Sequence, residues 1–137
     1  MAISVITLDT SGLLALANRR DPDHERTTAA LTRDPGPYLV PAGILAEITY
    51  MLEQRLGLPV LDLFLDDLTS GAYALDCGAD DFSRIRQLVN QYADLPLGFA
   101  DAAVVACAER SGGRVLTLDL HDFGVVARAG RISILPD

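Results

Sequence analysis

Four acidic side chains stand where a parallel α/β fold would bring them together. Asp9 ends the apolar run ISVITL, and Asp119 ends a second apolar segment, RVLTLD. Asp101 lies in the first turn of a predicted helix. Glu47 lies ~40° from Met51 on a helical wheel, at the border of an apolar face. Because the carboxyl ends of parallel strands meet at one edge of a sheet, we predict that the four acids converge there.

Each acid by itself has an ordinary explanation. Asp9 could cap the helix that follows it, and Asp101 could compensate a helix dipole. A solvated helix position would account for Glu47, and a turn would account for Asp119. None of these explanations says why acids from distant segments should end on the same edge of a sheet.

The convergence of these acids predicts a metal site. Carboxylates only a few ångströms apart repel one another, and a divalent cation is the natural compensation. A ligand set made only of oxygen suits Mg²⁺ or Mn²⁺ rather than zinc. The predicted metal-binding and catalytic residues are Asp9, Glu47, Asp101 and Asp119.

The elements that must position these acids alternate along the chain. Strands are predicted over 3–8, 38–40, 72–77, 114–119 and 132–135, and helices over 11–20, 24–33, 42–56, 60–69, 80–93 and 100–113, with a short helix within 121–130. Strands rich in Val, Ile and Leu and separated by helices are typical of a parallel sheet covered on both faces. We therefore predict one domain, residues 1–137, with an α/β/α sandwich around a mainly parallel central sheet.

Charge and composition exclude several classes of protein. The chain has 19 acids against 11 bases, a net charge of −8, and every base is arginine. The lack of lysine excludes a P-loop, a Schiff-base enzyme and a phospho-receiver domain, which needs a late lysine. An acidic chain binds nucleic acid only through a local arginine surface or when its acids hold metal. The arginines that could contact phosphate are Arg19, Arg20, Arg26, Arg84, Arg86, Arg110, Arg114 and Arg128.

Cysteine usage and hydropathy indicate a cytoplasmic protein. Cys77 and Cys107 form no CxxC motif, so neither a zinc site nor a disulfide framework is expected, and both are predicted to be small buried side chains. No apolar run reaches the ~20 residues of a membrane span. The N-terminus lacks the basic region of a secretory signal. We expect no membrane association.

Four segments resemble, in the same order, the motifs of the PIN-domain ribonucleases and, among these, the VapC-type toxins. The segments are LDTSGLLAL, VPAGILAEITYMLEQR, GFADAAVVACAER and RVLTLDLHDF. The resemblance assigns the four family acids to Asp9, Glu47, Asp101 and Asp119, in chain order. It also suggests supporting roles for Thr10, Ser11 and Asp122.

This resemblance implies a metal-dependent endoribonuclease that is the toxin of a toxin–antitoxin pair. Asp9 and Asp101 would hold Mg²⁺ or Mn²⁺ directly, and Glu47 and Asp119 would complete the site. It also implies a homodimer and a small VapB-type antitoxin partner. The sequence leaves open the RNA target, the number of metal ions and whether Asp122 contacts metal. The alternative is a non-catalytic PIN-fold protein that binds RNA or another partner.

Overall fold

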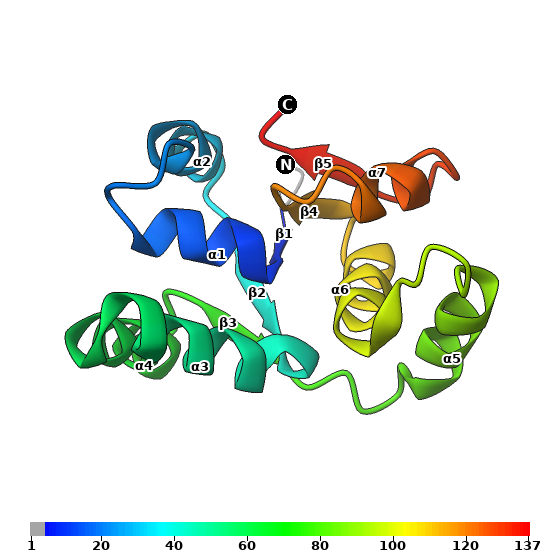
Figure 1. The fold of residues 1–137 in the computed structure, drawn as a ribbon, viewed down its shortest axis with the longest axis horizontal. Coiled ribbons are helices and arrows are strands. Elements are labelled where there is room, and N and C mark those ends of the chain that lie inside the picture. Colours follow the sequence, from blue (N-terminus) through cyan, green and yellow to red (C-terminus); the bar gives the residue numbers. More distant parts are fainter. Residues whose placement is uncertain (1–4) are drawn as a thin grey trace.

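Five short parallel strands form the centre of the molecule (Figure 1). The structure, a computed structural model, describes residues 5–137. Its strands are β1 (Ile6–Leu8), β2 (Tyr38–Pro41), β3 (Ala74–Asp76), β4 (Arg114–Leu116) and β5 (Ser133–Leu135). They lie in the order β3-β2-β1-β4-β5, and each neighbouring pair is parallel. The predicted strands are confirmed, four of them with shorter bounds and β2 with one more residue, Pro41. Residues 3 and 4 of the first predicted strand lie outside the described residues.

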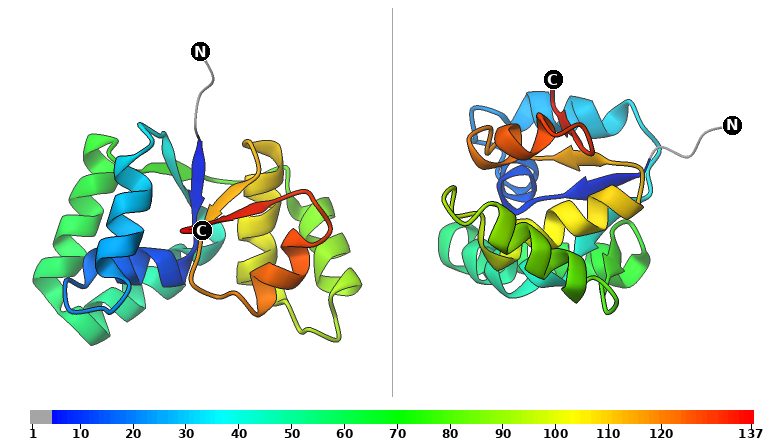
Figure 2. Two further views of the ribbon diagram at one scale, coloured as in Figure 1. Left: turned by 90° about the horizontal axis from the view of Figure 1, so that it is seen from above. Right: turned by 90° about the vertical axis from the view of Figure 1, so that its right-hand side faces the viewer.

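Helices cover both faces of this sheet. They are α1 (Thr10–Ala17), α2 (His24–Thr32), the 3-10 turn η1 (Ala42–Ile44), α3 (Leu45–Leu56), α4 (Leu58–Ser70), α5 (Phe82–Gln91), α6 (Gly98–Arg110) and α7 (Asp122–Ala127). Helices α1 to α4 lie on one side and α5 to α7 on the other (Figure 2). The predicted α/β/α sandwich is therefore confirmed, with a sheet that is wholly parallel among the described strands.

Strand β1 and helix α6 lie at the centre of the core. Ile6 and Leu8 of β1 are fully buried, because helices cover both faces of the strand. Helix α6 packs on β1 and β4, and its uncharged run 102–108 is buried throughout. Each acid of interest therefore extends from an element that the core fixes in place: Asp9 follows β1, and Asp101 lies in the first turn of α6.

Two glycines allow close approaches beside this edge of the sheet. A Cβ on Gly12 would lie 2.6 Å from the carbonyl oxygen of Leu116, so only glycine lets the first turn of α1 lie against β4. A Cβ on Gly43 would lie 2.5 Å from the Cβ of Ala103. The η1 turn therefore packs directly on α6, and this contact brings the start of α3 toward the start of α6.

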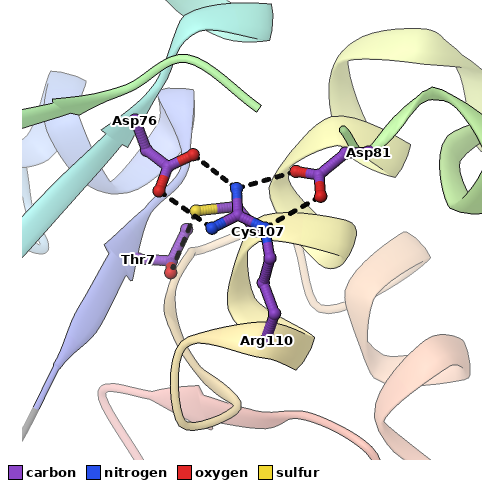
Figure 3. Close-up of polar contacts among 5 residues, drawn as sticks. All are labelled: Thr7, Asp76, Asp81, Cys107 and Arg110. Atoms are coloured by element: carbon purple, nitrogen blue, oxygen red, sulfur yellow. Dashed lines mark hydrogen bonds and ion pairs between the residues drawn. The ribbon is translucent and has the colours of Figure 1, made fainter. Parts of the chain in front are cut away.

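An arginine at the other end of α6 joins that helix to the β3–α5 connection (Figure 3). The guanidinium of Arg110 donates to both carboxylate oxygens of Asp81, at 2.8 and 2.7 Å, and to both oxygens of Asp76. We call these three residues the arginine clamp. The Cys107 sulfur lies beside it, 3.8 Å from the Thr7 hydroxyl. Cys107 is buried as predicted, but Cys77 is exposed because it follows β3 in the surface connection.

Among residues 5–137, no helix has both the length and the apolar character needed to cross a membrane.

Candidate metal centre

Asp9 is a buried carboxylate held by hydroxyl groups. It directly follows β1, is only 4% exposed and stands at the N-cap position of α1, yet its side chain makes no capping hydrogen bond. Instead, Ser11 and Thr117 both donate to its Oδ2, at 2.9 and 2.8 Å. Burial raises the pKa of Asp9, and the hydroxyl groups and the nearby backbone N–H groups of Thr10 and Ser11 partly offset that rise. The side chain of Asp9 is therefore directed toward a site rather than used as a helix cap.

Asp101 is the acid whose pKa is raised by the charges of the other predicted acids. Burial raises its pKa to about 7, reinforced by the charges of Asp9, Asp119, Asp122 and Glu47, in falling order of effect. The half-buried carboxyl at the start of α6 thus lies within electrostatic reach of all the others. The structure brings the four sequence-predicted acids together at one edge of the sheet.

Three of the acids form a compact group. Carboxylate oxygens of Asp101, Asp119 and Asp122 lie within 4.8 Å of one another, and each side chain is half-buried. The backbone N–H of Asp122 donates to Asp119 Oδ1 at 3.1 Å, which fixes the loop that follows β4. The exposed ring of His121 lies against Asp122, with Nδ1 2.9 Å from Oδ1. Asp122 therefore belongs to the group as fully as Asp119 does.

Asp9 and Glu47 lie around this group rather than within it. Asp9 exerts the largest charge effect on Asp101, although it is outside the set of three mutually close acids. Glu47, in the first turn of α3, is exposed and exerts the smallest of the four effects. Its neighbour Ile48 is fully buried, so Glu47 lies at the border of the apolar face of α3, as the helical wheel predicts.

The hydroxyl residues differ from the expectation in one respect. Ser11 donates to Asp9, whereas Thr10 Oγ1 is buried and has no hydrogen-bond partner among residues 5–137. Sequence reasoning missed Thr117, which makes the shorter bond to Asp9. A threonine inside an apolar strand is read as a β-branched strand former, so only its place two residues before Asp119 could have signalled a polar role.

Most arginines with described ion pairs are used to hold the fold together. Arg84 binds Glu109, Arg110 forms the clamp and Arg114 binds Asp34. Among residues 5–137, no arginine is within ion-pair distance of the four sequence-predicted acids. The site is therefore strongly negative, and among residues 5–137 only the exposed ring of His121, beside Asp122, lies within ion-pair distance of its acids.

The donor set fits a divalent cation. Several carboxylates, half-buried or deeper, converge without an arginine among residues 5–137, and burial together with the charges of the neighbouring acids raises the pKa of Asp101. Oxygen ligands of this kind are those that Mg²⁺ and Mn²⁺ prefer. The fold and this cluster define a doubly wound α/β protein with an acidic site at the carboxyl edge of its sheet.

Comparison with known proteins identifies the family. The model of the PIN domain family matches residues 6–129. Ribonuclease VapC26 of Mycobacterium tuberculosis is 32% identical over 133 residues, which cover 94% of this chain and 98% of that protein. The chain therefore belongs to the PIN-domain family, and within it to the VapC ribonucleases.

Two solved structures share the fold. VapC20 of M. tuberculosis, described as a toxin that cleaves the sarcin-ricin loop, superposes with a TM-score of 0.76 at 21% identity. This match covers 91% of this chain and 95% of that one. VapBC2 of Rickettsia felis, bound to a DNA fragment from its promoter, gives a TM-score of 0.68 at 15% identity and covers 96% and 97% of the two chains.

Proposed function

We propose that this protein is a Mg²⁺- or Mn²⁺-dependent endoribonuclease and the toxin of a toxin–antitoxin pair. The observation that carries the proposal is the convergence of carboxylates without an arginine partner, among residues 5–137, around Asp101 at the edge of a PIN-type sheet. The naming of its 32% identical relative as a ribonuclease supports RNA as the substrate. The cleaved bond is an RNA phosphodiester.

The acids of the site would share the metal. Asp101, Asp119 and Asp122 offer oxygens close enough together to bind one cation. Asp9, which follows β1, and Glu47, in the first turn of α3, would complete the ligand set. This distribution gives Asp122 a direct role beside Asp119, which the sequence left open.

The chemistry is the attack of water on a phosphodiester. When bound, a divalent cation would offset the phosphate charge and acidify a water molecule. A carboxylate of the cluster accepts the proton of the attacking water, as general-base catalysis requires. Glu47 is exposed to solvent and could accept that proton, whereas the buried Asp9 is shielded from water and is suited to a fixed ligand role.

The partners follow from the family. We propose a small VapB-type antitoxin as the protein partner, supported by the structural neighbour that is a VapBC complex. We also propose a homodimer that works in the cytoplasm. These proposals agree with the class of the relatives, and co-purification of the chain with the product of an adjacent small gene tests the first of them.

Cleavage of RNA by the purified chain tests the proposed activity. We expect cleavage with Mn²⁺ or Mg²⁺, no cleavage with EDTA, and no cleavage by the Asp9→Asn variant. Asp62→Asn, which changes an exposed acid on α4, is the matched control and should cleave as the wild type does. Mapping the 5′ ends of the fragments would identify the RNA target. Cleavage that persists in EDTA would contradict the proposed metal dependence. Binding of RNA without cleavage would favour the non-catalytic alternative.

A further inference from the structure

We propose that Ser11 and Thr117 form a hydroxyl bracket, a pair of positioning residues that fixes the orientation of Asp9 and its position relative to Asp119. The inference rests on the proposed function, because it concerns how the same site is held ready for its metal. Ser11 comes from the first turn of α1, and Thr117 directly follows β4. The bracket therefore joins the two neighbouring strands that carry Asp9 and Asp119.

The hydrogen bonds of the bracket run in a defined direction. A hydroxyl donates one hydrogen bond and accepts others. Ser11 donates to Asp9 Oδ2 at 2.9 Å and accepts from the backbone N–H of Leu118 at 2.9 Å. Thr117 donates to the same oxygen at 2.8 Å and accepts from the backbone N–H of Asp119 at 3.0 Å. The two hydroxyl oxygens are 3.1 Å apart, with both protons directed to the charged acceptor.

Both hydroxyl groups of the bracket donate to the same oxygen of Asp9. Both donors reach Oδ2 from different elements, and neither contacts Oδ1. Two bonds to the same oxygen prevent the carboxylate from turning about its last bond, because rotation would break both. The bracket therefore holds Oδ2 in place and fixes the plane of the Asp9 carboxylate relative to the other acids of the site.

The bracket also links Asp9 through hydrogen bonds to the two acids that follow β4. Thr117 accepts from the N–H of Asp119, and Asp119 Oδ1 accepts from the N–H of Asp122 at 3.1 Å. A continuous series of hydrogen bonds thus runs from the carboxylate after β1 to the two acids after β4. Acids that repel one another need such a restraint to remain close before a cation arrives.

Hydroxyl side chains are required at both positions. Each group must donate to a carboxylate and accept from an N–H at once, which valine and alanine cannot do. The close approach at Gly12 provides the space, since a Cβ there would meet the Leu116 carbonyl oxygen at 2.6 Å and move Ser11 away from Thr117. The residue types and the glycine between α1 and β4 therefore act together.

Binding of Mn²⁺ alone, measured by calorimetry, tests the bracket with Thr117→Val, Ser11→Ala and Thr117→Ser. Loss of residues that orient metal ligands lowers metal affinity by about 10–100-fold. We expect this loss for Thr117→Val, a smaller loss for Ser11→Ala, and affinity within about threefold of the wild type for Thr117→Ser. Thr7→Val is the matched control, because Thr7 is a buried threonine of β1 whose hydroxyl lies 3.8 Å from the Cys107 sulfur and, among residues 5–137, has no hydrogen bond to the acids of the site.

A purely structural role would lower the thermal midpoint of the metal-free protein without a selective loss of affinity. Equal Mn²⁺ affinity for the wild type and Thr117→Val would overturn the bracket and leave the proposed function intact. If that variant does not fold, equal affinity for Ser11→Ala and the wild type would overturn it in the same way. A wild type that binds no Mn²⁺ would overturn both the proposed function and the bracket.

Discussion

The two ends of helix α6 treat carboxylates in opposite ways. At its C-terminal end, Arg110 binds Asp76 and Asp81, and these bonds hold the pKa of Asp76 below its usual range. At its N-terminal end, burial and neighbouring acids raise the pKa of Asp101 to about 7. Both regions place buried or half-buried acids next to one another, but only the clamp contains its own counter-ion.

The difference separates a structural cluster from a functional one. The clamp contains its own cation, because Arg110 binds both carboxylates and so joins α5, α6 and β3 (Figure 3). The acidic site has no arginine partner among residues 5–137, so the folded state carries repulsion that a cation can relieve. A charge left unbalanced in a well-packed fold indicates that the balancing charge arrives with a ligand.

The largest expected effect is on catalysis. Asp101→Asn removes the carboxylate that all the other acids face, and we expect RNA cleavage to fall by at least about 1,000-fold, a loss of about 4 kcal/mol of transition-state stabilisation. The same change should raise the thermal midpoint of the metal-free protein, because it relieves repulsion. Cleavage of a labelled RNA and a melting curve measure the two effects. Undiminished cleavage by this variant, with Asp62→Asn as control, would contradict the catalytic role of the site.

Metal should stabilise the wild type through the acidic site alone. At a Mn²⁺ concentration of 100 times Kd, binding to the folded state adds about 2.7 kcal/mol to the free energy of unfolding. Thermal unfolding with and without Mn²⁺ measures this gain. The Asp101→Asn variant should lose most of it, whereas Asp76→Asn in the clamp should retain it. Equal stabilisation of both variants would show that the cation binds elsewhere.

Removal of the arginine should damage the clamp and spare the site. Arg110→Met leaves Asp76 and Asp81, whose side chains are only 19% and 11% exposed, without their cation. We expect the free energy of unfolding in urea to fall by about 2 kcal/mol, less than for a fully buried pair because Arg110 is partly exposed. Mn²⁺ affinity should stay within about twofold of the wild type. A large loss of affinity at unchanged stability would mean that the clamp belongs to the site.

The smallest expected effect is an opposite pH dependence of the two regions. The pKa of Asp101 is raised in the folded state from 3.8 to about 7, so folded protein binds more protons in this window and stability falls as pH rises from about 4 to 7. After allowance for solvent screening, this loss is about 1 kcal/mol. The pKa of Asp76 is lowered, so its contribution is lost as pH falls below 3.8.

Urea unfolding across this pH range, for the wild type against Asp101→Asn and Asp76→Asn, measures both slopes. The stability difference between the wild type and Asp101→Asn should shift against the wild type as pH rises to 7. The difference from Asp76→Asn should shift in favour of the wild type as pH rises to about 4. Parallel curves for all three proteins would mean that the two regions do not differ in charge compensation.

The sequence predicted the strand and helix order well because the apolar runs are clear. The uncharged run 102–108 suits a helix buried on most sides, and the structure confirms it. The bounds were less certain, since the predicted helix 42–56 begins as a 3-10 turn before α3. The residues at which a helix begins and ends depend on local packing. Here the deciding contact is that of Gly43 with α6, and no pattern in the sequence reveals it.

The candidate site was predictable in its acids and not in its supporting groups. Asp9 and Asp119 end apolar runs, so their residue types and positions were enough to predict them as site residues. Thr117 lies within such a run and reads as a strand residue, although it makes the shorter of the two hydroxyl bonds to Asp9. Thr10 and Ser11 looked equivalent, yet only the Ser11 hydroxyl reaches that carboxylate, because the first turn of α1 directs the two side chains differently.

By itself, the sequence determined which acids exist, which elements carry them and that a parallel sheet would gather them at one edge. Only the tertiary structure decided which acids lack a counter-ion, because Arg110 lies 34 residues from Asp76 along the chain and could have paired with any carboxylate. It also decided that Asp122 joins Asp101 and Asp119 within 4.8 Å. Charge compensation depends on distance in space, and distance between remote segments is fixed only when the core has packed.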